Sequence, residues 1–389
     1  MKLHSVPWPL ALVILLLSSC AQLQPPKEEA RPFRFEKLDL TRSDENGQPL
    51  WRLVSPLTRY QLEERRSSLS DPVATIYKEG KPQYTVTASK GLVIDDGEHV
   101  ELFGGVTFRV LDERQIVVRA DRVFWQREYD IIKFEGNPTL LDLTRRVVAG
   151  EARFHTDTDM LFAWEGINLK SWQGNRDESQ PASLELNTQH LNWNTSDGKL
   201  NIDSPIKGIQ RPTADRLRRL SSPSMSGNTR QEWYDFNAPV LISEEAESLN
   251  IRAGRSRWWA AEQRITSSEP AEGTVKELNV TGSELEILQK ESLLRIGQDC
   301  RLVQPDQELT AELCSWNWGS GEVLAEGGVI LRRDELQQVT RSSRLEGVTG
   351  EDGRITFSAP GQRVKTRLQI QEEQAVPGKP PQAVTPVEF

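Results

Sequence analysis

Histidine, cysteine and methionine are scarce in this chain of 389 residues, which holds four, three and three of them. The three histidines beyond the N-terminal stretch, His99, His155 and His190, lie far apart at expected turns or polar faces, so they predict no shared metal site. The chain also lacks a glycine-rich phosphate loop, a G-x-S-x-G elbow and an H-E-x-x-H motif. Pairs of carboxylates such as Asp95 and Asp96 fall where turns are expected, and aspartate is an ordinary turn former. We therefore expect no enzyme activity and no cofactor.

Concentrated basic surfaces and long amphipathic helices are missing as well. The formal net charge is -9 and the isoelectric point is about 5.3, whereas proteins that bind nucleic acid need a concentrated basic face. We therefore expect no nucleic acid among the partners. No long segment repeats its apolar residues every 3.6 positions, so helices should be few.

The N-terminal stretch has the pattern of an export signal. Residues 9–17 form an apolar run that is shorter than the about 20 residues needed to cross a membrane as a helix. The run ends in L-S-S-C at Cys20 and there resembles the bacterial lipobox, in which the cysteine sulfur carries a diacylglycerol. The sequence thus predicts a lipoprotein signal peptide over residues 1–19, lipid attachment at Cys20 and a flexible spacer over residues 20–32. An ordinary signal peptide with an incidental cysteine stays open.

Two further cysteines, Cys300 and Cys314, flank a plausible turn at Pro305 and Asp306. If the turn joins neighbouring strands, it brings the two thiols close together. In an exported chain such a pair predicts a disulfide. Two buried free thiols or a metal site stay open as alternatives, although the absence of a nearby histidine disfavours the metal.

What the chain does have is a recurring strand–turn–strand pattern, clearest over residues 82–110. There Tyr84, Val86 and Ala88 alternate with threonine and serine, as in a half-buried strand. A small residue at the end of one strand recurs sixteen positions before a glycine or acidic residue, in the pairs Ala88 and Gly104, Ala120 and Gly136, Gly150 and Gly166, Asn187 and Asp203, Ala253 and Glu269, Thr281 and Gly297, and Ala311 and Gly327. Most of these units start about 30 residues apart, which predicts stacked hairpins that share one continuous core.

These patterns divide the chain into modules. The sequence predicts a first β module over residues 33–208 and a second over residues 239–370. Residues 209–238 are rich in serine, proline and glycine and contain the basic run A-D-R-L-R-R-L, so they favour a linker or insertion with a short helix. Residues 371–389 are predicted to be a disordered tail.

The chain holds 11 tryptophans, and several recur within the repeated units. In alternating strands, residues such as Trp125, Trp193 and Trp316 most often pack in a core. They could instead line an apolar groove for a lipid or a sugar chain, and the pattern leaves both readings open.

Three segments carry a resemblance to a known family. They read L-D-L-T-R-S-D-E-N-G-Q-P-L-W-R-L-V-S-P-L-T-R-Y from Leu38, Y-T-V-T-A-S-K-G with V-E-L-F-G-G-V from Tyr84, and L-T-A-E-L-C-S-W-N-W-G-S-G-E-V-L-A-E-G-G-V from Leu309. Together they resemble the LptA/LptC/OstA-like family of lipopolysaccharide export, and LptC in particular. The chain differs from the familiar LptC pattern, which has one transmembrane anchor and one jelly roll, because it has a lipobox and about twice the β repeat.

The resemblance implies an all-β fold of tandem, open-ended antiparallel β jelly rolls with an apolar interior. It implies a periplasmic subunit, lipid-anchored to a membrane and favoured at the inner one, that passes lipopolysaccharide or a related glycolipid toward the outer membrane. The implied partners are ABC transporter permeases with their ATPase, and a periplasmic bridge protein or an outer-membrane translocon barrel. A β scaffold that binds envelope polysaccharide or protein is the alternative. The expected inward positions, candidates for lining the lipid groove, are the alternating residues Val86, Ala88, Leu102, Phe108, Val118, Ala120, Ile132, Phe134 and Val148.

Overall fold

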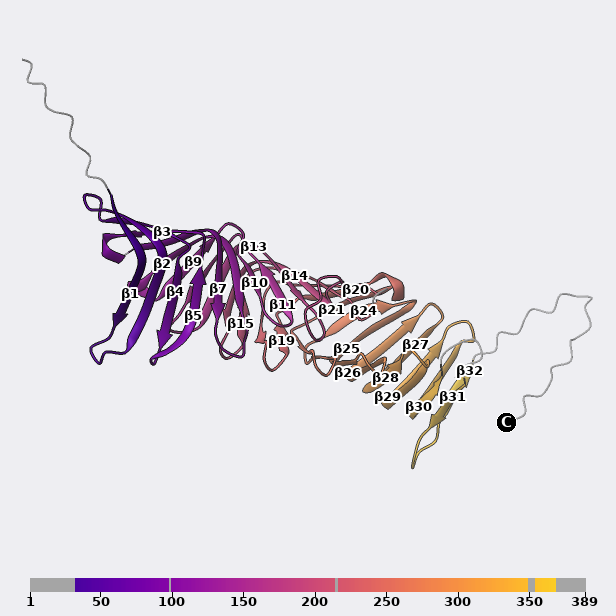
Figure 1. Cartoon of the computed structure of the whole chain (residues 1–389). Coiled ribbons are helices and arrows are strands. Elements are labelled where there is room, and N and C mark those ends of the chain that lie inside the picture. Colours follow the sequence, from indigo (N-terminus) through magenta and orange to yellow (C-terminus); the bar gives the residue numbers. More distant parts are fainter. Residues whose placement is uncertain (1–31, 98, 214–215, 349–353, 369–389) are drawn as a thin grey trace, which may run out of the picture.

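The computed structural model describes residues 32–97, 99–213, 216–348 and 354–368. These residues form an elongated stack of antiparallel strands, with β1 at one end and β32 at the other (Figure 1). The only helical elements among them are the short 3-10 turns η2 (Asp95–Gly97), η3 (Arg127–Tyr129) and η4 (Glu245–Glu247). The all-β prediction is therefore confirmed.

The first half of the stack holds the strands β1 (Phe33–Ser43), β2 (Pro49–Gln61), β3 (Arg66–Ser70), β4 (Val73–Lys78), β5 (Lys81–Thr87), β6 (Lys90–Ile94), β7 (His99–Val110), β8 (Val117–Gln126), β9 (Ile131–Glu135), β10 (Thr139–Leu141), β11 (Arg145–Val148), β12 (Glu151–His155), β13 (Met160–Ser171), β14 (Leu184–Asn194), β15 (Lys199–Ile202) and β16 (Ile206–Gln210). The second half holds β17 (Arg218–Ser222), β18 (Met225–Asn228), β19 (Trp233–Phe236), β20 (Val240–Glu244), β21 (Leu249–Ala253), β22 (Ser256–Trp259), β23 (Arg264–Ser267), β24 (Ala271–Val275), β25 (Leu278–Leu288), β26 (Leu293–Gln304), β27 (Gln307–Ala311), β28 (Leu313–Asn317), β29 (Glu322–Arg333), β30 (Gln338–Val348), β31 (Ile355–Ser358) and β32 (Lys365–Leu368).

The strands build two facing walls that share their longest members. In β7, for example, residues 99–103 pair with β6 in one wall, and residues 107–110 pair with β5 in the other. We call the wall that contains β6 wall A and the wall that contains β5 wall B. Long strands such as β8, β13, β26 and β29 also pass from one wall to the other, and they join the walls along one edge. Between β14 and β25 the pairings close into a ring of twelve strands.

The sixteen-residue recurrence in the sequence coincides with the places where long strands bend between the walls. Gly136 has a φ of +81°, and a Cβ there would collide with the Asp121 side chain at the bend of β8. Gly327 has a φ of +79°, and a Cβ there would collide with Glu312. Positive φ and a close side chain both require glycine at these two positions. The bends therefore explain why a glycine ends most of the units at a constant spacing.

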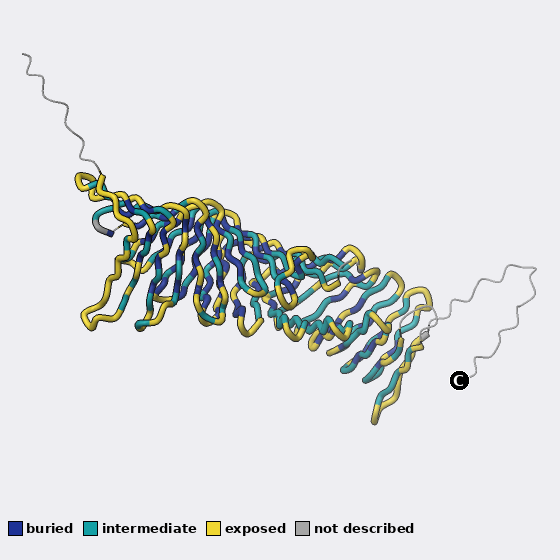
Figure 2. The backbone as a smooth tube through the Cα atoms, in the orientation of Figure 1, coloured by how far each residue is buried: buried dark blue, intermediate teal, exposed yellow. Residues whose placement is uncertain are grey.

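The walls pack tightly in the first half of the stack. Tyr84 and Phe108 from wall B meet Phe134 and Phe154 from wall A, with ring centroids 5.4–5.6 Å apart, and all four residues are at most 3% exposed. Figure 2 shows this concentration of buried residues, whereas the strands toward the C-terminal end are mostly half-buried. Aromatic rings thus fill the space between the walls in this half.

The segment predicted as a linker or insertion is an integral part of the walls. Residues 218–236 form β17, β18 and β19, and each of these strands pairs on both sides. The prediction of a linker is therefore wrong for these residues, and so is that of a short helix at Arg218–Leu220, which lies in β17. β17 pairs with β16 on one side and with β20 on the other, and it thereby completes wall B. The two buried apolar clusters separate instead between Ala253 and Val280.

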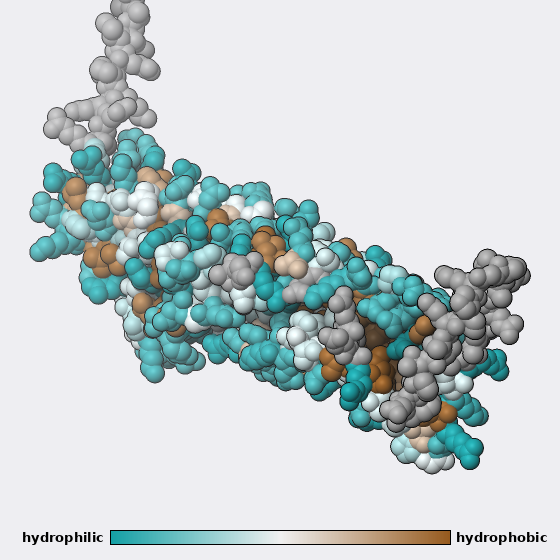
Figure 3. All heavy atoms as spheres, turned by 90° about the vertical axis from the view of Figure 1, so that its right-hand side faces the viewer, coloured by the Kyte–Doolittle hydropathy of each residue, from teal (hydrophilic) through white to brown (hydrophobic). Residues whose placement is uncertain are grey.

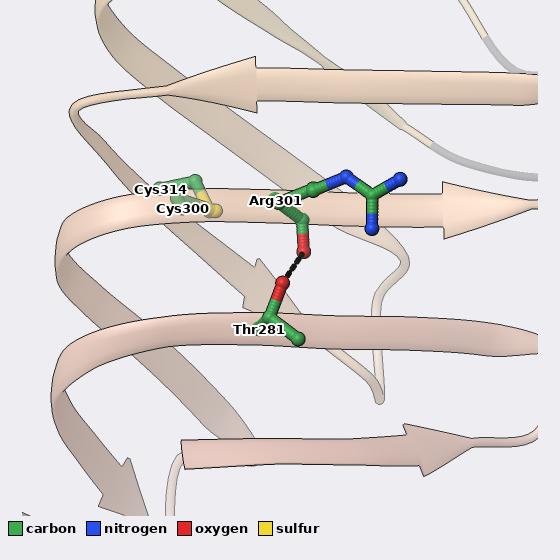
Figure 4. Close-up of a disulfide and its surroundings, with 4 residues drawn as sticks. All are labelled: Thr281, Cys300, Arg301 and Cys314. Atoms are coloured by element: carbon green, nitrogen blue, oxygen red, sulfur yellow. Dashed lines mark hydrogen bonds between the residues drawn. A yellow bond between two sulfur atoms is a disulfide. The ribbon is translucent and has the colours of Figure 1, made fainter. Parts of the chain in front are cut away.

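Cys300 and Cys314 form a disulfide at the edge where the walls join (Figure 4). Cys300 lies in the part of β26 that pairs with β27 in wall B, and Cys314 lies in β28 of wall A. Their Cα atoms are 6.0 Å apart, and both residues are buried. The neighbouring ladder is supported by Thr281, whose hydroxyl donates a hydrogen bond to the Arg301 carbonyl oxygen over 3.5 Å. The disulfide therefore ties wall A to wall B in the C-terminal half.

Replacing both cysteines by alanine is expected to destabilise the C-terminal half by about 3 kcal/mol, because a disulfide that closes a loop of about 15 residues restricts the unfolded chain by that amount. Urea unfolding of the purified chain measures the effect. Reductant should lower the stability of the wild type toward that of the double variant and leave the variant unchanged. A wild type that is insensitive to reductant would contradict this expectation.

The terminal predictions lie outside the described residues. These are the signal peptide over residues 1–19, lipid attachment at Cys20, most of the 20–32 spacer and the tail over residues 371–389. Within the described part of the chain, no helix has the length and apolarity to cross a membrane.

Candidate functional site

The predicted groove-lining residues lie together between the walls, but most of them are packed. Val86, Ala88, Leu102, Phe108, Val118, Ala120, Ile132 and Phe134 belong to the buried cluster of the first half, where none is more than 9% exposed. Val148 is only half-buried, and its neighbour Val147 takes the inward position at 3% exposure. The inward assignment of Val148 is therefore wrong by one residue, which reverses the face in a strand. The hypothesis that the other eight contact lipid is not tested by the structure, and photocrosslinking at Phe134 decides between it and a packed core.

A buried ion pair holds the walls together on the side where the hairpin turns face each other. Arg114, in the β7–β8 turn of wall B, donates from Nη1 to Asp159 Oδ1 over 2.8 Å and to Thr195 Oγ1 over 2.9 Å. Asp159 and Thr195 belong to turns of wall A, and Tyr84 also donates from its hydroxyl to Asp159 Oδ1 over 2.8 Å. The side chains of Arg114 and Asp159 are 8% and 11% exposed. We call Arg114, Asp159, Thr195 and Tyr84 the latch.

Burial and hydrogen bonding shift the ionisation of groups in and beside the latch. Burial, together with the hydrogen bond to Asp159, raises the pKa of the Tyr84 hydroxyl, which therefore stays protonated as a donor. Burial also acts to raise the pKa of Asp112, but hydrogen bonds from the Arg114 side chain and backbone outweigh it, and the pKa lies below its ordinary value. Asp112 therefore stays ionised and helps to neutralise Arg114, whose Nη2 lies 2.6 Å from its carboxylate.

Other contacts join the same two sets of turns in the first half. Lys78 Nζ donates to the Asp157 carbonyl oxygen over 3.2 Å. Arg145 Nη2, in the β10–β11 hairpin of wall B, donates to the Thr229 carbonyl oxygen of wall A over 2.9 Å. With the latch, these bonds close the side opening of the first half.

The C-terminal half instead holds an apolar trough of about 780 Å³ between the walls. Figure 3, which looks from the C-terminal side, shows apolar side chains gathered in a hollow there. Polar residues such as Lys276, Glu277 and Ser320 lie at the rim of the trough, in the β24–β25 and β28–β29 turns. The apolar lining comes from β24–β31 and consists of Val275, Leu278, Leu302, Leu309, Trp316, Trp318, Val323, Leu331, Leu345, Val348 and Ile355. From here on, the trough means these apolar residues together with the polar residues at the rim.

The trough continues inward through two narrow cavities. The first has a volume of about 50 Å³ and shares Val275, Trp316 and Trp318 with the trough. The second, of about 40 Å³, shares Arg218 and Ile242 with the first, among other residues. A different groove of about 780 Å³ lies over wall B, where apolar side chains such as Ile209, Leu220 and Leu241 share the lining with charged and polar residues.

The sequence left open whether the tryptophans pack in a core or line an apolar groove, and the structure contains both kinds. Trp125 and Trp193 are buried in the first half at 6% and 5% exposure. Trp316 and Trp318 line the trough. The sequence could not separate these pairs, because alternation gives the inward face of a strand but not the distance to the opposite wall.

Bent strands that join two walls around a trough define an all-β protein with a groove between its walls. Residues 10–133 match the family described as "Lipopolysaccharide-assembly, LptC-related". The chain therefore carries an LptC-related domain in this region, and the resemblance drawn from the sequence is confirmed there. The match covers less than half of the chain.

Several solved chains are similar to this protein, whereas the curated proteins include no match. No curated protein matches the chain. The structure of LptH from Pseudomonas aeruginosa, described as the LptA homologous periplasmic component of the conserved lipopolysaccharide transport device, is 9% identical over 39% of this chain and 81% of that chain, with a TM-score of 0.20.

Proposed function

We propose that this protein carries lipopolysaccharide or a related acylated glycolipid, with the acyl chains lying in the trough. The observation that carries the proposal is the row of apolar side chains along the trough in a chain that has an LptC-related domain. Each CH₂ group shielded from water contributes about 0.8 kcal/mol, so a trough of this size can offset much of the cost of moving acyl chains through water.

The setting of this activity belongs to the same proposal. The protein would be a non-catalytic periplasmic subunit, held at the membrane through a lipid on Cys20 and supplied by an ABC transporter with its ATPase. It would hand the lipid to a bridge protein or an outer-membrane barrel, with two β modules in series. Purification of the acylated chain from membranes should recover the transporter. Cys20→Ala should release the chain from the membrane, and a variant that remains bound would contradict the anchor.

Binding of fluorescently labelled lipopolysaccharide to the purified chain tests the proposal. Trp316→Asp places a charge on the apolar lining, and we expect it to weaken binding by about tenfold or more, because an unpaired charge against acyl chains costs several kcal/mol. Ser315→Asp is the matched control, since Ser315 precedes Trp316 on β28 and does not line the trough. Val348→Asp, at a residue that is 43% exposed, makes the same test with less risk to folding. Equal binding by all four proteins would contradict the proposal.

A scaffold that binds polysaccharide is the second candidate function. Arg257 stacks on Trp233 and Trp259 at 4.7 and 5.3 Å, and Arg264 stacks on Trp259 at 5.1 Å. These residues alternate with the inward-packed Tyr234 and Trp258, so they present an aromatic surface on the outside of wall A. Loss of polysaccharide binding in Trp233→Ala, with glycolipid binding absent from the wild type, would favour this function.

A further inference from the structure

A row of polar side chains crosses the interior between the packed first half and the trough. Glu244 on β20, whose side chain is 0% exposed, accepts hydrogen bonds from Arg218 Nε over 3.1 Å and from Arg218 Nη2 over 2.8 Å. Arg218 Nη1 donates to Gln210 Oε1 over 3.3 Å. Gln289, in the β25–β26 turn of wall A, donates from Nε2 to the same oxygen over 3.4 Å. These four residues, which we call the polar barrier, join wall B to wall A.

Arg218 and Glu244 lie at the inner end of the path that leads from the trough. The cavity of about 50 Å³ shares three apolar lining residues with the trough, and Arg218 and Glu244 are also part of its lining. The cavity of about 40 Å³ lies beyond it and borders it at Arg218, Ile242 and Ile265. An acyl chain that extends inward from the trough therefore meets the ion pair before it reaches the second cavity.

The polar barrier also lies where the two buried apolar clusters meet. Ile242 belongs to the cluster of the first half and Leu294 to that of the second, and both line the 50 Å³ cavity. Leu249, Ile251 and Ile287 line it as well. A buried ion pair in such surroundings is often no more stabilising than apolar side chains of similar volume. Stability alone therefore does not account for charged residues at this place.

We propose that the polar barrier ends the path of the acyl chain and thereby sets the longest chain that the trough accepts. This inference rests on the proposed function and names the residues that select its ligand. A chain end that advances past Arg218 has to separate the guanidinium from Glu244, which leaves buried charges without their partners beside hydrocarbon. That cost exceeds what each further CH₂ group contributes by its burial, so elongation of the chain beyond the barrier adds no affinity.

The affinity for a homologous series of alkyl maltosides tests the inference. The series runs from decyl to hexadecyl maltoside, its members differ only in chain length, and each is titrated into the full chain below its micelle concentration by calorimetry. The wild type should bind about fourfold more tightly for each CH₂ group that enters the trough or the first cavity. The gain should stop at the member whose chain reaches Arg218. We call this chain length the break point.

Two variants should move the break point in opposite directions. Arg218→Met with Glu244→Leu replaces the ion pair by apolar side chains of similar size and should shift the break point to longer chains. Arg216, which also pairs with Glu244, has a side chain that is 29% exposed and therefore keeps contact with water in this variant. Ile287→Phe narrows the 50 Å³ cavity without altering the ion pair, and it should shift the break point to shorter chains.

Arg219→Met is the matched control, since Arg219 is next to Arg218 but pairs with the exposed Glu245, and it should leave the break point unchanged. Opposite shifts are not expected of residues that only stabilise the fold. Circular dichroism checks folding. If the double variant is unfolded, Arg218→Met with Glu244→Gln removes both charges, keeps an acceptor for Arg216 and should shift the break point in the same direction.

The possible outcomes separate this inference from the proposed function. If the wild type binds neither labelled lipopolysaccharide nor any maltoside, the proposed function fails and the inference fails with it. If the wild type binds them but its affinity rises through the whole series, the inference is overturned while the proposed function stands. A break point that the folded double variant leaves in place also overturns the inference.

Discussion

Asp159→Ala is expected to lower the free energy of unfolding of the first half by about 3–5 kcal/mol. The variant leaves the Arg114 guanidinium, whose side chain is 8% exposed, without its carboxylate partner from wall A. Breaking one side of a buried ion pair costs this much because the remaining charge stays away from water. The Tyr84 hydroxyl loses an acceptor in the same step. Urea unfolding, followed by circular dichroism, measures the difference.

Two further variants separate the latch from a general effect of losing an acidic residue. Asp157→Ala removes an exposed carboxylate from the same turn and should change stability by less than about 0.5 kcal/mol. The pair Arg114→Met with Asp159→Leu should recover much of the lost stability, because apolar groups of similar size can replace a buried ion pair. If Asp159→Ala costs no more than Asp157→Ala, the latch does not hold the walls together.

Phe134→Ala is expected to cost about 3–5 kcal/mol, because Phe134 is fully buried and its removal leaves a cavity beside Phe108. Trp316→Ala removes a larger side chain but should cost at least about 2 kcal/mol less, because Trp316 is half-buried and borders the trough. The comparison tests directly whether the first half is packed and the second half open.

Urea unfolding of the two variants should show this difference in two places. The buried clusters are separate, so Phe134→Ala should shift the transition of the first half and Trp316→Ala that of the second. Phe124→Ala, at a half-buried position next to the buried Trp125 on β8, serves as the control for losing an aromatic ring outside the core. Equal costs for Phe134 and Trp316 would contradict the proposed difference in packing.

The sequence predicts the strands well, because burial on one face imposes a two-residue alternation. Val86, Phe108 and Phe134 are inward in the structure for that reason. The glycines that end most of the units also carried information, since bends such as the one beside Gly136 admit no side chain. Val148 shows the limit of such patterns, because in R-R-V-V two adjacent valines fit either register and only the pairing with β13 decides between them.

The organisation of the walls could not be predicted from local patterns. Serine, proline and glycine at residues 209–238 suggested a linker or insertion, yet β17 and β18 are held by pairing with strands on either side. The latch joins Arg114 to residues 45 and 81 positions away, so no local motif marks it. Arg218 occupies the same face of β17 as Leu220 and Ser222, so the sequence could have indicated its inward position. Its ion pair with Glu244 becomes visible only in the structure, which brings β20 beside β17.

The account places acyl chains in the trough of the C-terminal half. Site-specific photocrosslinking in cells tests this most directly, with a photoreactive amino acid at Trp318 in the trough, at Phe134 in the packed first half, and at Ser315 outside the lining. We expect glycolipid to be captured at Trp318 and not at Ser315, with little or no capture at Phe134. Capture at Phe134 or Ser315 that equals or exceeds capture at Trp318 would contradict the account.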